Sequence, residues 1–215
     1  MKIGIIGAGN IGRAYAVLWH AAGHQVFLSS RTPENHREFV ESLGDGALVG
    51  SSAEAAAFGD VILLAPNYAS SDAAIEEIRP HVQGKLVMDA MNPLRKPGDR
   101  RTEPLIGDGE IAGLVTAAKL PEARIAKAFT TLWSRHVETK SNINNPTVAL
   151  PFAVDDAEDQ ETLARLITDA GFVPAYVGSL KDSGPLDPGS PIWNIVLTKD
   201  EALAKARDFN FSRTQ

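Results

Sequence analysis

Short apolar runs alternate with amphipathic stretches along almost the whole chain. Helical spacing of apolar residues is clearest over residues 11–22, where five apolar positions share one face. Strand-like apolar runs cover residues 2–6, 25–29, 47–50, 60–65, 85–90, 124–129, 147–154 and 173–177. Strands that are apolar on both sides and alternate with helices predict an α/β fold, a doubly wound and mainly parallel Rossmann sheet with a small C-terminal extension.

Residues that begin and end helices set further boundaries. Ser51-Ser52-Ala53-Glu54 has the sequence of a capping box and predicts a short helix that ends at Gly59. Asp156 is expected to cap a helix that Gly171 ends. Other helices are expected over residues 71–79, 110–119 and 191–207. We expect an NADP-binding Rossmann domain over residues 1–145 and a small C-terminal part, residues 146–215, packed on the same domain.

Composition excludes several classes of function. The 215 residues include no cysteine, which removes disulfides, thiolate metal sites and a cysteine nucleophile, and the histidines show no metal-ligand spacing. We therefore expect no metal site. A formal net charge of −6 argues against nucleic acid and membranes as partners. Met1 and Lys2 lead directly into an apolar strand and no apolar stretch has the length of a membrane span, so a cytoplasmic location is expected.

A glycine-rich sequence joins the first predicted strand to the first predicted helix. In this context G-x-G-x-x-G is typical of dinucleotide binding, whereas alone it could be an ordinary turn. The first glycine permits a tight turn, the second admits a pyrophosphate close to the backbone, and the third allows close helix packing. The residues expected to bind the pyrophosphate at the positive end of the helix are Gly7, Ala8, Gly9, Asn10, Ile11 and Gly12.

The end of the second predicted strand indicates which dinucleotide binds. An NAD site places an acidic residue there to bond the ribose, but this chain has Ser30, Arg31 and Thr32. A hydroxyl and a guanidinium suit a 2′-phosphate, and a charge-assisted contact of this kind contributes about 1.5–3 kcal/mol. The sequence therefore predicts NADP(H) as the cofactor. The alternative is that Arg31 is an ordinary solvated arginine.

Three further turns are expected to line the cofactor crevice, because ligands of open α/β sheets bind at the carboxyl ends of strands. For each turn the alternative is a structural turn residue, above all where Asn92 precedes Pro93. The residues concerned are Ala65, Pro66, Asn67 and Tyr68 after the fourth strand, Met91, Asn92 and Pro93 after the fifth, and Phe129, Thr130 and Thr131 after the sixth.

Taken together, these motifs resemble the coenzyme F420-dependent NADP oxidoreductase family. The resemblance rests on Gly7–Gly12, on Ser30-Arg31, on Ala126–Phe129 with Thr131, and on Gly184-Pro185-Leu186. It implies hydride transfer between NADPH and a deazaflavin, with Ser30 and Arg31 at the 2′-phosphate and the nicotinamide near Pro66 and the turn after the sixth strand. Flavin is the other acceptor considered, since relatives of this fold act on flavin. Thr130, where the family has Asn or His, and residues 187–215 depart from the family pattern.

Two other functions stay open. A reductase of a small carbonyl or imine would need a proton donor near the nicotinamide. The sequence does not indicate which residue would be that donor, and it predicts no catalytic residue. A non-enzymatic NADP(H) sensor would bind the cofactor without turnover. Hydride transfer between flat rings requires mainly that the reacting carbons be held about 3–3.5 Å apart, so the small-molecule redox acceptor is expected in a shallow cleft, which a homodimer could share.

Two groups of residues could contribute to an acceptor site. The basic cluster within residues 95–101 (Arg95, Lys96, Arg100 and Arg101) could attract an anionic acceptor, or it could be an ordinary solvated loop. Trp133 and Trp193 could stack on an acceptor ring, or they could pack in the core or at an interface.

Overall fold

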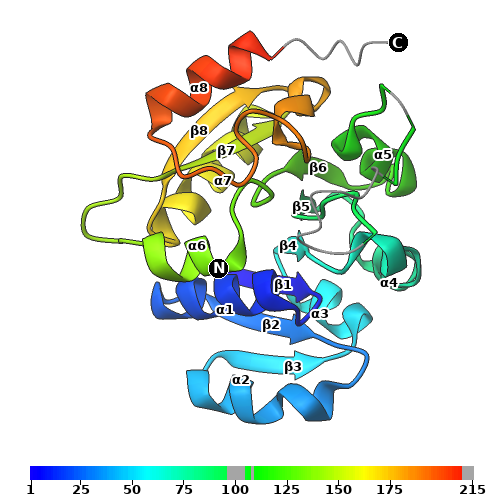
Figure 1. Ribbon diagram of the computed structural model, residues 1–215. Helices are drawn as coiled ribbons and strands as arrows, with labels where there is room; N and C mark the ends of the chain where they lie inside the picture. Colours follow the sequence, from blue (N-terminus) through cyan, green and yellow to red (C-terminus); the bar gives the residue numbers. More distant parts are fainter. Residues whose placement is uncertain (96–104, 108, 210–215) are drawn as a thin grey trace.

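The computed structural model describes residues 1–95, 105–107 and 109–209. One eight-stranded sheet has the strand order β3-β2-β1-β4-β5-β6-β7-β8 (Figure 1). The chain moves from β1 to one edge of the sheet and then returns to place β4 on the other side of β1, which is the topological switch point of a Rossmann fold. The predicted α/β doubly wound class is confirmed. The strands are β1 (Lys2–Ile6), β2 (Gln25–Ser29), β3 (Ala47–Gly50), β4 (Val61–Leu64), β5 (Leu86–Asp89), β6 (Arg124–Lys127), β7 (Ala149–Val154) and β8 (Val173–Gly178).

Helices cover both faces of this sheet. The buried side chains of α1, α2, α6 and α7 join one apolar cluster, and those of α3 and α4 join another on the opposite face, where α5 also packs. Helix α8 lies over β7 and β8 at one end of the molecule (Figure 1). The helices are α1 (Asn10–Ala21), α2 (Arg37–Leu43), α3 (Ser52–Phe58), α4 (Ser71–Ile78), α5 (Ala112–Lys119), α6 (Ser134–Lys140), α7 (Ala157–Asp169) and α8 (Lys199–Asp208).

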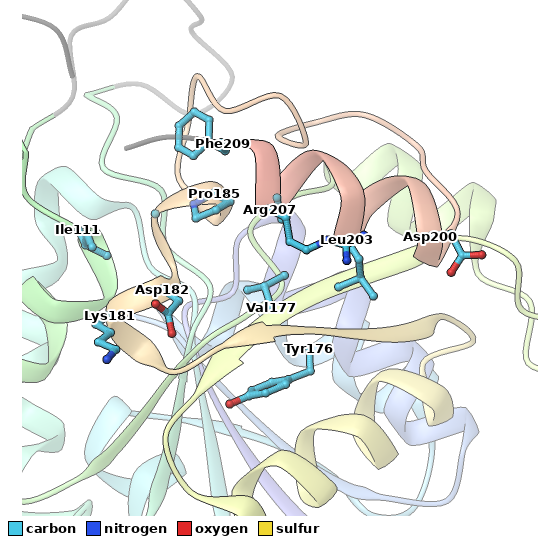
Figure 2. A pocket seen from close by; sticks show the side chains of 12 residues that line it. Ile111, Tyr176, Val177, Lys181, Asp182, Pro185, Asp200, Leu203, Arg207 and Phe209 are labelled. Atoms are coloured by element: carbon cyan, nitrogen blue, oxygen red, sulfur yellow. The ribbon is translucent and has the colours of Figure 1, made fainter. Parts of the chain in front are cut away.

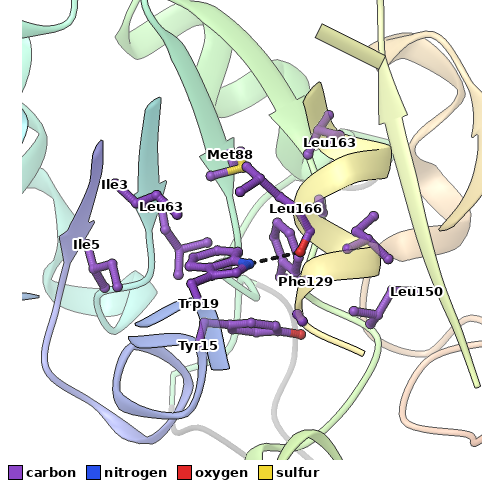
Figure 3. Close-up of a cluster of buried hydrophobic side chains, with 14 of the residues drawn as sticks. Ile3, Ile5, Tyr15, Trp19, Leu63, Met88, Phe129, Leu150, Leu163 and Leu166 are labelled. Atoms are coloured by element: carbon purple, nitrogen blue, oxygen red, sulfur yellow. Dashed lines mark hydrogen bonds between the residues drawn. The ribbon is translucent and has the colours of Figure 1, made fainter. Parts of the chain in front are cut away.

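Aromatic side chains of α1 form the centre of the larger cluster (Figure 3). The Trp19 ring lies 5.1 Å from the Tyr15 ring and 5.4 Å from the Phe129 ring, between centroids. The Trp19 Nε1–H donates a 2.8 Å hydrogen bond to the Leu166 carbonyl, so its only polar atom is satisfied and α1 is joined to α7. The hydroxyl of Tyr15 is equally buried and makes no hydrogen bond within the described chain.

The C-terminal part of the chain continues the same sheet. Strand β7 pairs with β6 antiparallel, at Ala126 and Val154, and is the exception in an otherwise parallel sheet. Strand β8 pairs with β7 in parallel, with a register shift between Phe152 and Ala153 and with Pro174 in the edge strand. Because one sheet includes both parts, the boundary at residue 145 stays a prediction.

The capping residues predicted from the sequence are confirmed, but the predicted start of the last helix is wrong. Ser51 and Glu54 form the capping box of α3, and the Asp156 side chain caps α7. Helix α8 begins at Lys199 rather than near residue 191, because Thr198 and Glu201 form a capping box there. Residues 191–194 form a turn instead, with Asn194 in the left-handed region (φ 58°). The seven-residue helices α2 and α6 were not predicted. Among the described residues, no helix combines the length and the apolar character that crossing a membrane requires.

Candidate functional site

The glycine-rich turn between β1 and α1 leaves room for an anion. Gly7 has a positive φ of 105°, and a Cβ there would lie 2.8 Å from the Ala65 carbonyl oxygen. A Cβ on Gly12 would overlap the Gly7 carbonyl oxygen, whereas a Cβ on Gly9 would meet nothing within 4 Å. Gly9 caps α1 without a side-chain hydrogen bond, and the first turn of α1 contains no acidic residue. Free N–H groups, the helix dipole and open space together fit a pyrophosphate.

The turn after β2 lies beside this loop. The Gly7 N–H donates to Ser29 Oγ over 3.1 Å, which connects the glycine turn to the end of β2. Ser30 Oγ accepts a hydrogen bond from the Thr32 N–H over 3.2 Å. Arg31 is exposed and, within the described part of the chain, pairs with no acidic side chain. The guanidinium is therefore available to an anion such as a 2′-phosphate.

A cavity of about 540 Å³ extends from the start of α1 across the ends of β4, β5 and β6. Its volume is in the usual range for a small-molecule site. Of the residues predicted for the cofactor crevice, it brings together Gly9, Asn10, Ile11, Ala65, Pro66, Asn67, Tyr68, Met91, Asn92 and Phe129. It also includes Trp133 and Trp193, the two candidates for stacking on an acceptor ring, and adds Ala90, Leu94, Leu132, Ser134 and Arg135. Arg135 is the one charged side chain among these described lining residues.

Some predicted residues lie outside the cavity or have a structural role. Gly7, Ala8, Gly12, Ser30, Arg31, Thr32 and Thr130 do not line it. Thr130 is buried, and its hydroxyl donates to the Leu186 carbonyl over 3.0 Å. The buried ring of Phe129 packs 4.7 Å from that of Tyr15, so its side chain belongs to the core. Arg95 is exposed, whereas Lys96, Arg100 and Arg101 lie outside the described residues.

Two asparagines at strand ends have different surroundings. Asn67 Oδ1 accepts the Ala69 N–H over 3.2 Å, as a turn residue does. The Asn92 amide donates to the Thr130 carbonyl over 3.1 Å and joins the ends of β5 and β6. Asn92 Oδ1 is buried and has no hydrogen-bond partner in the described chain. Because a buried acceptor without a partner is costly, this oxygen fits a donor on a bound ligand.

A buried ion pair lies directly behind the strand ends. Lys127 and Asp89 are both fully buried, and Lys127 Nζ lies 3.0 Å from Asp89 Oδ2 and 2.6 Å from the Met91 carbonyl oxygen. Asp89 also accepts hydrogen bonds from the Met91 N–H and the Thr116 hydroxyl. Asp187, which accepts the Ala112 N–H, lies 4.0 Å from Lys127 Nζ. These contacts connect the turn after β5 with the C-terminal segment.

Tyr68 is a predicted crevice residue that lines the cavity. It directly follows Asn67, and its side chain is half-buried. Burial, together with the negative charges of Asp89 and Asp187, raises the pKa of Tyr68 to about 12. The phenol is therefore protonated at neutral pH and can donate a proton or a hydrogen bond.

A second cavity, of about 760 Å³, lies between β8, the 3₁₀ turn Leu180–Asp182 and α8 (Figure 2). Lys181, Asp182 and Arg207 are among its lining residues. Gly184 and Pro185 of the family motif line it, but none of the residues predicted to bind the cofactor does, so the smaller cavity is the candidate site. Among the described residues, no group of three His, Asp or Glu side chains could hold a metal ion.

Comparison with known proteins agrees with this geometry. Residues 2–93 match the family model described as NADP oxidoreductase, coenzyme F420-dependent. The predicted resemblance to this family is confirmed. The match covers β1 to the turn after β5, which contains the glycine turn and the Ser30–Thr32 turn. The description of the family agrees with the predicted class, an NADP-dependent oxidoreductase, and with the predicted cofactor, NADP(H).

Individual relatives extend the likeness over most of the chain. The metalloreductase STEAP3 of Rattus norvegicus is 25% identical over 179 residues, which are 83% of this chain and 34% of that protein. The chain thus spans about a third of this curated relative. The structure of the hypothetical protein SMa0349 from Sinorhizobium meliloti has a TM-score of 0.80 and 27% identity, covering 93% and 96% of the two chains. A protein from Arthrobacter sp. FB24, provisionally described as an F420-dependent NADP reductase, has a TM-score of 0.72 and 22% identity, over 85% and 87% of the two chains.

Proposed function

We propose that this chain transfers a hydride from NADPH to a deazaflavin such as coenzyme F420, or to a flavin. One observation carries the proposal. A single cavity runs from the uncapped start of α1, at Gly9 and Asn10, to the tryptophans Trp133 and Trp193. A phosphate-binding helix start at one end and aromatic side chains at the other fit a dinucleotide whose nicotinamide meets a second flat ring.

The residues of the glycine turn and of the strand ends would bind different parts of the cofactor. Backbone N–H groups of Gly9, Asn10 and Ile11 would hold the pyrophosphate, and Ser30, Arg31 and Thr32 the 2′-phosphate. The nicotinamide would lie along Ala65–Asn67, with its carboxamide donating to Asn92 Oδ1, which has no other partner in the described chain.

The chain contributes position and exclusion of water rather than acid–base chemistry. NADPH supplies a hydride, and one proton from solvent completes the two-electron reduction of the acceptor. Leu94, Leu132 and Trp193 give the cavity apolar walls that exclude water. Asp89 and Lys127 hold both the N–H and the carbonyl of Met91, so the turn that leads to Asn92 is fixed before ligands bind.

The test is NADPH-dependent reduction of coenzyme F420, run beside FMN and FAD, with NADH as the alternative donor. We expect turnover with NADPH and at least one of these acceptors, and a preference for NADPH over NADH of about tenfold to a hundredfold. Tight NADPH binding without reduction of any acceptor would instead favour the sensor. Equal use of NADH would contradict the role of Ser30 and Arg31.

A second candidate function, reduction of a small carbonyl or imine, is favoured by Tyr68. Its protonated phenol lines the cavity and could protonate a reduced oxygen or nitrogen. The Tyr68→Phe variant separates the two functions. If carbonyl reduction is the activity, this change lowers its kcat by roughly 10²–10⁴-fold. If the acceptor is a flavin or deazaflavin, kcat stays close to that of the wild type.

We also propose a cytoplasmic location and a homodimer that shares the acceptor cleft. Sedimentation velocity with and without NADPH tests the assembly. A dimer that forms or tightens with cofactor agrees with the proposal, and a monomer at all concentrations contradicts it.

A further inference from the structure

We infer that Trp133, Trp193 and Arg135 form the acceptor subsite, which takes a planar tricyclic ring that carries an anionic side chain. This inference rests on the proposed function and names the part of the cavity that selects the acceptor. Trp133 and Arg135 come from the start of α6, and Trp193 comes from the turn before α8. All three line the cavity that begins at the glycine turn.

Trp193 is brought to the cavity by a turn that specific hydrogen bonds hold in place. The Asn194 N–H donates to the Thr131 carbonyl over 2.7 Å, and Asn194 Oδ1 accepts the Trp133 N–H over 3.3 Å. The Trp193 N–H donates to Ser190 Oγ over 3.1 Å. Asn194 has a left-handed backbone, which costs energy for a residue other than glycine and persists where its surroundings fix it. The backbone segments that carry the two tryptophans are therefore held side by side.

Trp133 has an unusual position for a tryptophan. It precedes α6 directly, and 42% of its surface is exposed beside the cavity. Trp193 is 9% exposed, so it forms a wall, whereas Trp133 keeps much of its surface accessible. Indole rings bind flat aromatic molecules through stacking or edge contacts. A tricyclic ring placed here would cover the open surface of Trp133.

Arg135 supplies the charge for the acceptor's side chain. It is exposed, and no acidic side chain of the described chain pairs with it. The described lining residues include no Asp or Glu, so Arg135 is the charged side chain among them that an anion can contact. A guanidinium next to an aromatic wall suits a phosphate-bearing side chain, such as those of FMN and coenzyme F420. Riboflavin has the ring of FMN but lacks the phosphate.

The experiment measures binding to the full chain, saturated with NADP⁺, from the quenching of flavin or deazaflavin fluorescence. We expect Trp133→Leu and Trp193→Leu to weaken FMN and F420 binding about tenfold, whereas Trp133→Phe and Trp193→Phe keep most of it. Arg135→Gln should weaken FMN about tenfold and leave riboflavin unchanged. Arg165→Gln removes the same charge from α7, away from the cavity, and it should leave the binding of both FMN and riboflavin unchanged.

The outcomes separate the subsite from the proposed function. If the wild type reduces FMN or F420 but binding is unchanged in Trp133→Leu, Trp193→Leu and Arg135→Gln, the subsite is refuted and the proposed function stands. Weaker NADPH binding in Arg135→Gln, with FMN unaffected, would assign Arg135 to the cofactor's phosphates and overturn its role here. Wild-type protein that neither binds nor reduces any flavin or deazaflavin would refute the proposed function. Since Trp133 is exposed, its leucine variant should fold, which thermal unfolding checks.

Discussion

The two ends of the cavity differ in what forms their walls. At the start of α1 the walls are backbone, because Gly7, Gly9 and Gly12 have no side chains and the helix presents its free N–H groups. At the far end the walls are the side chains of Trp133, Arg135 and Trp193, held by an irregular turn and by hydrogen bonds. Backbone geometry follows from the β1–α1 topology, whereas the far end depends on side chains that can change without altering the sheet. A fold built this way can keep one cofactor while its acceptor varies.

The largest expected effect is at the backbone-built end. Gly9→Val should abolish measurable NADPH binding, because its side chain would fill the space through which a pyrophosphate approaches. A Cβ at position 9 meets no atom within 4 Å and the backbone of Gly9 is extended, so the melting temperature should stay close to that of the wild type. Gly12→Ala, by contrast, should destabilise the fold, because its Cβ would overlap the Gly7 carbonyl oxygen. Normal NADPH binding by Gly9→Val would refute the placement of the phosphates.

The next largest expected effect is on stability, at the buried ion pair between Lys127 and Asp89 behind the strand ends. Lys127→Met leaves Asp89 buried without its cation and should lower the free energy of unfolding by about 3–5 kcal/mol, measured by urea denaturation. The double variant Lys127→Met/Asp89→Asn should recover part of this loss. Lys119→Met breaks the exposed pair with Asp72 and serves as a control, with an expected loss of about 0–1 kcal/mol. Equal losses in both single variants would contradict the role of burial.

Arg31 lies beside the backbone-built end but acts through its side chain. Arg31→Gln should lower kcat/KM for NADPH by about tenfold to a hundredfold and leave that for NADH unchanged, because only NADPH carries the 2′-phosphate. The matched control is Arg165→Gln, which removes the same charge from α7. A parallel loss with NADPH and NADH would show that Arg31 acts on the fold or on a shared part of both cofactors.

The smallest expected effect lies in the core below the site. Tyr15→Phe removes a buried hydroxyl without a partner in the described chain and should raise the free energy of unfolding by about 1 kcal/mol. Burial also raises the pKa of Tyr15 above its ordinary value of 10.0. The unfolded chain therefore releases this proton first, and stability falls as the pH rises above 10. Urea denaturation at neutral and alkaline pH should show a smaller alkaline loss in Tyr15→Phe, and an equal loss would contradict burial as its cause.

Regular elements were predictable because their signals are local. The apolar runs marked all eight strands, and Ser51, Glu54 and Asp156 marked helix starts. Helices α2 and α6 were missed because seven residues give too short an amphipathic pattern. The start of α8 could have been found, since Thr198-x-x-Glu201 is a capping-box sequence like the one that marked α3.

The candidate site was predictable where the backbone defines it. Motifs identified the glycine turn and the strand ends, and the structure gathers many of these residues around one cavity. Contacts between distant segments were not predictable. Lys127 is 38 residues from its partner Asp89, and the Trp133–Asn194 hydrogen bond spans 61 residues. The buried role of Thr130 was not predictable either, because its hydroxyl donates to the carbonyl of Leu186, which is distant in the sequence.

The outer strand β8 limits how copies of this chain could associate. An edge strand with unpaired backbone groups invites pairing with an edge strand of another molecule. Here Pro174 lacks an N–H donor, and the register shift between Phe152 and Ala153 distorts the ladder beside it. At the opposite edge, β3 has only four residues. Pro174 and the register shift thus disfavour continuation of the sheet at β8, and the short β3 offers few backbone groups to pair, so we expect a homodimer to use helices or loops.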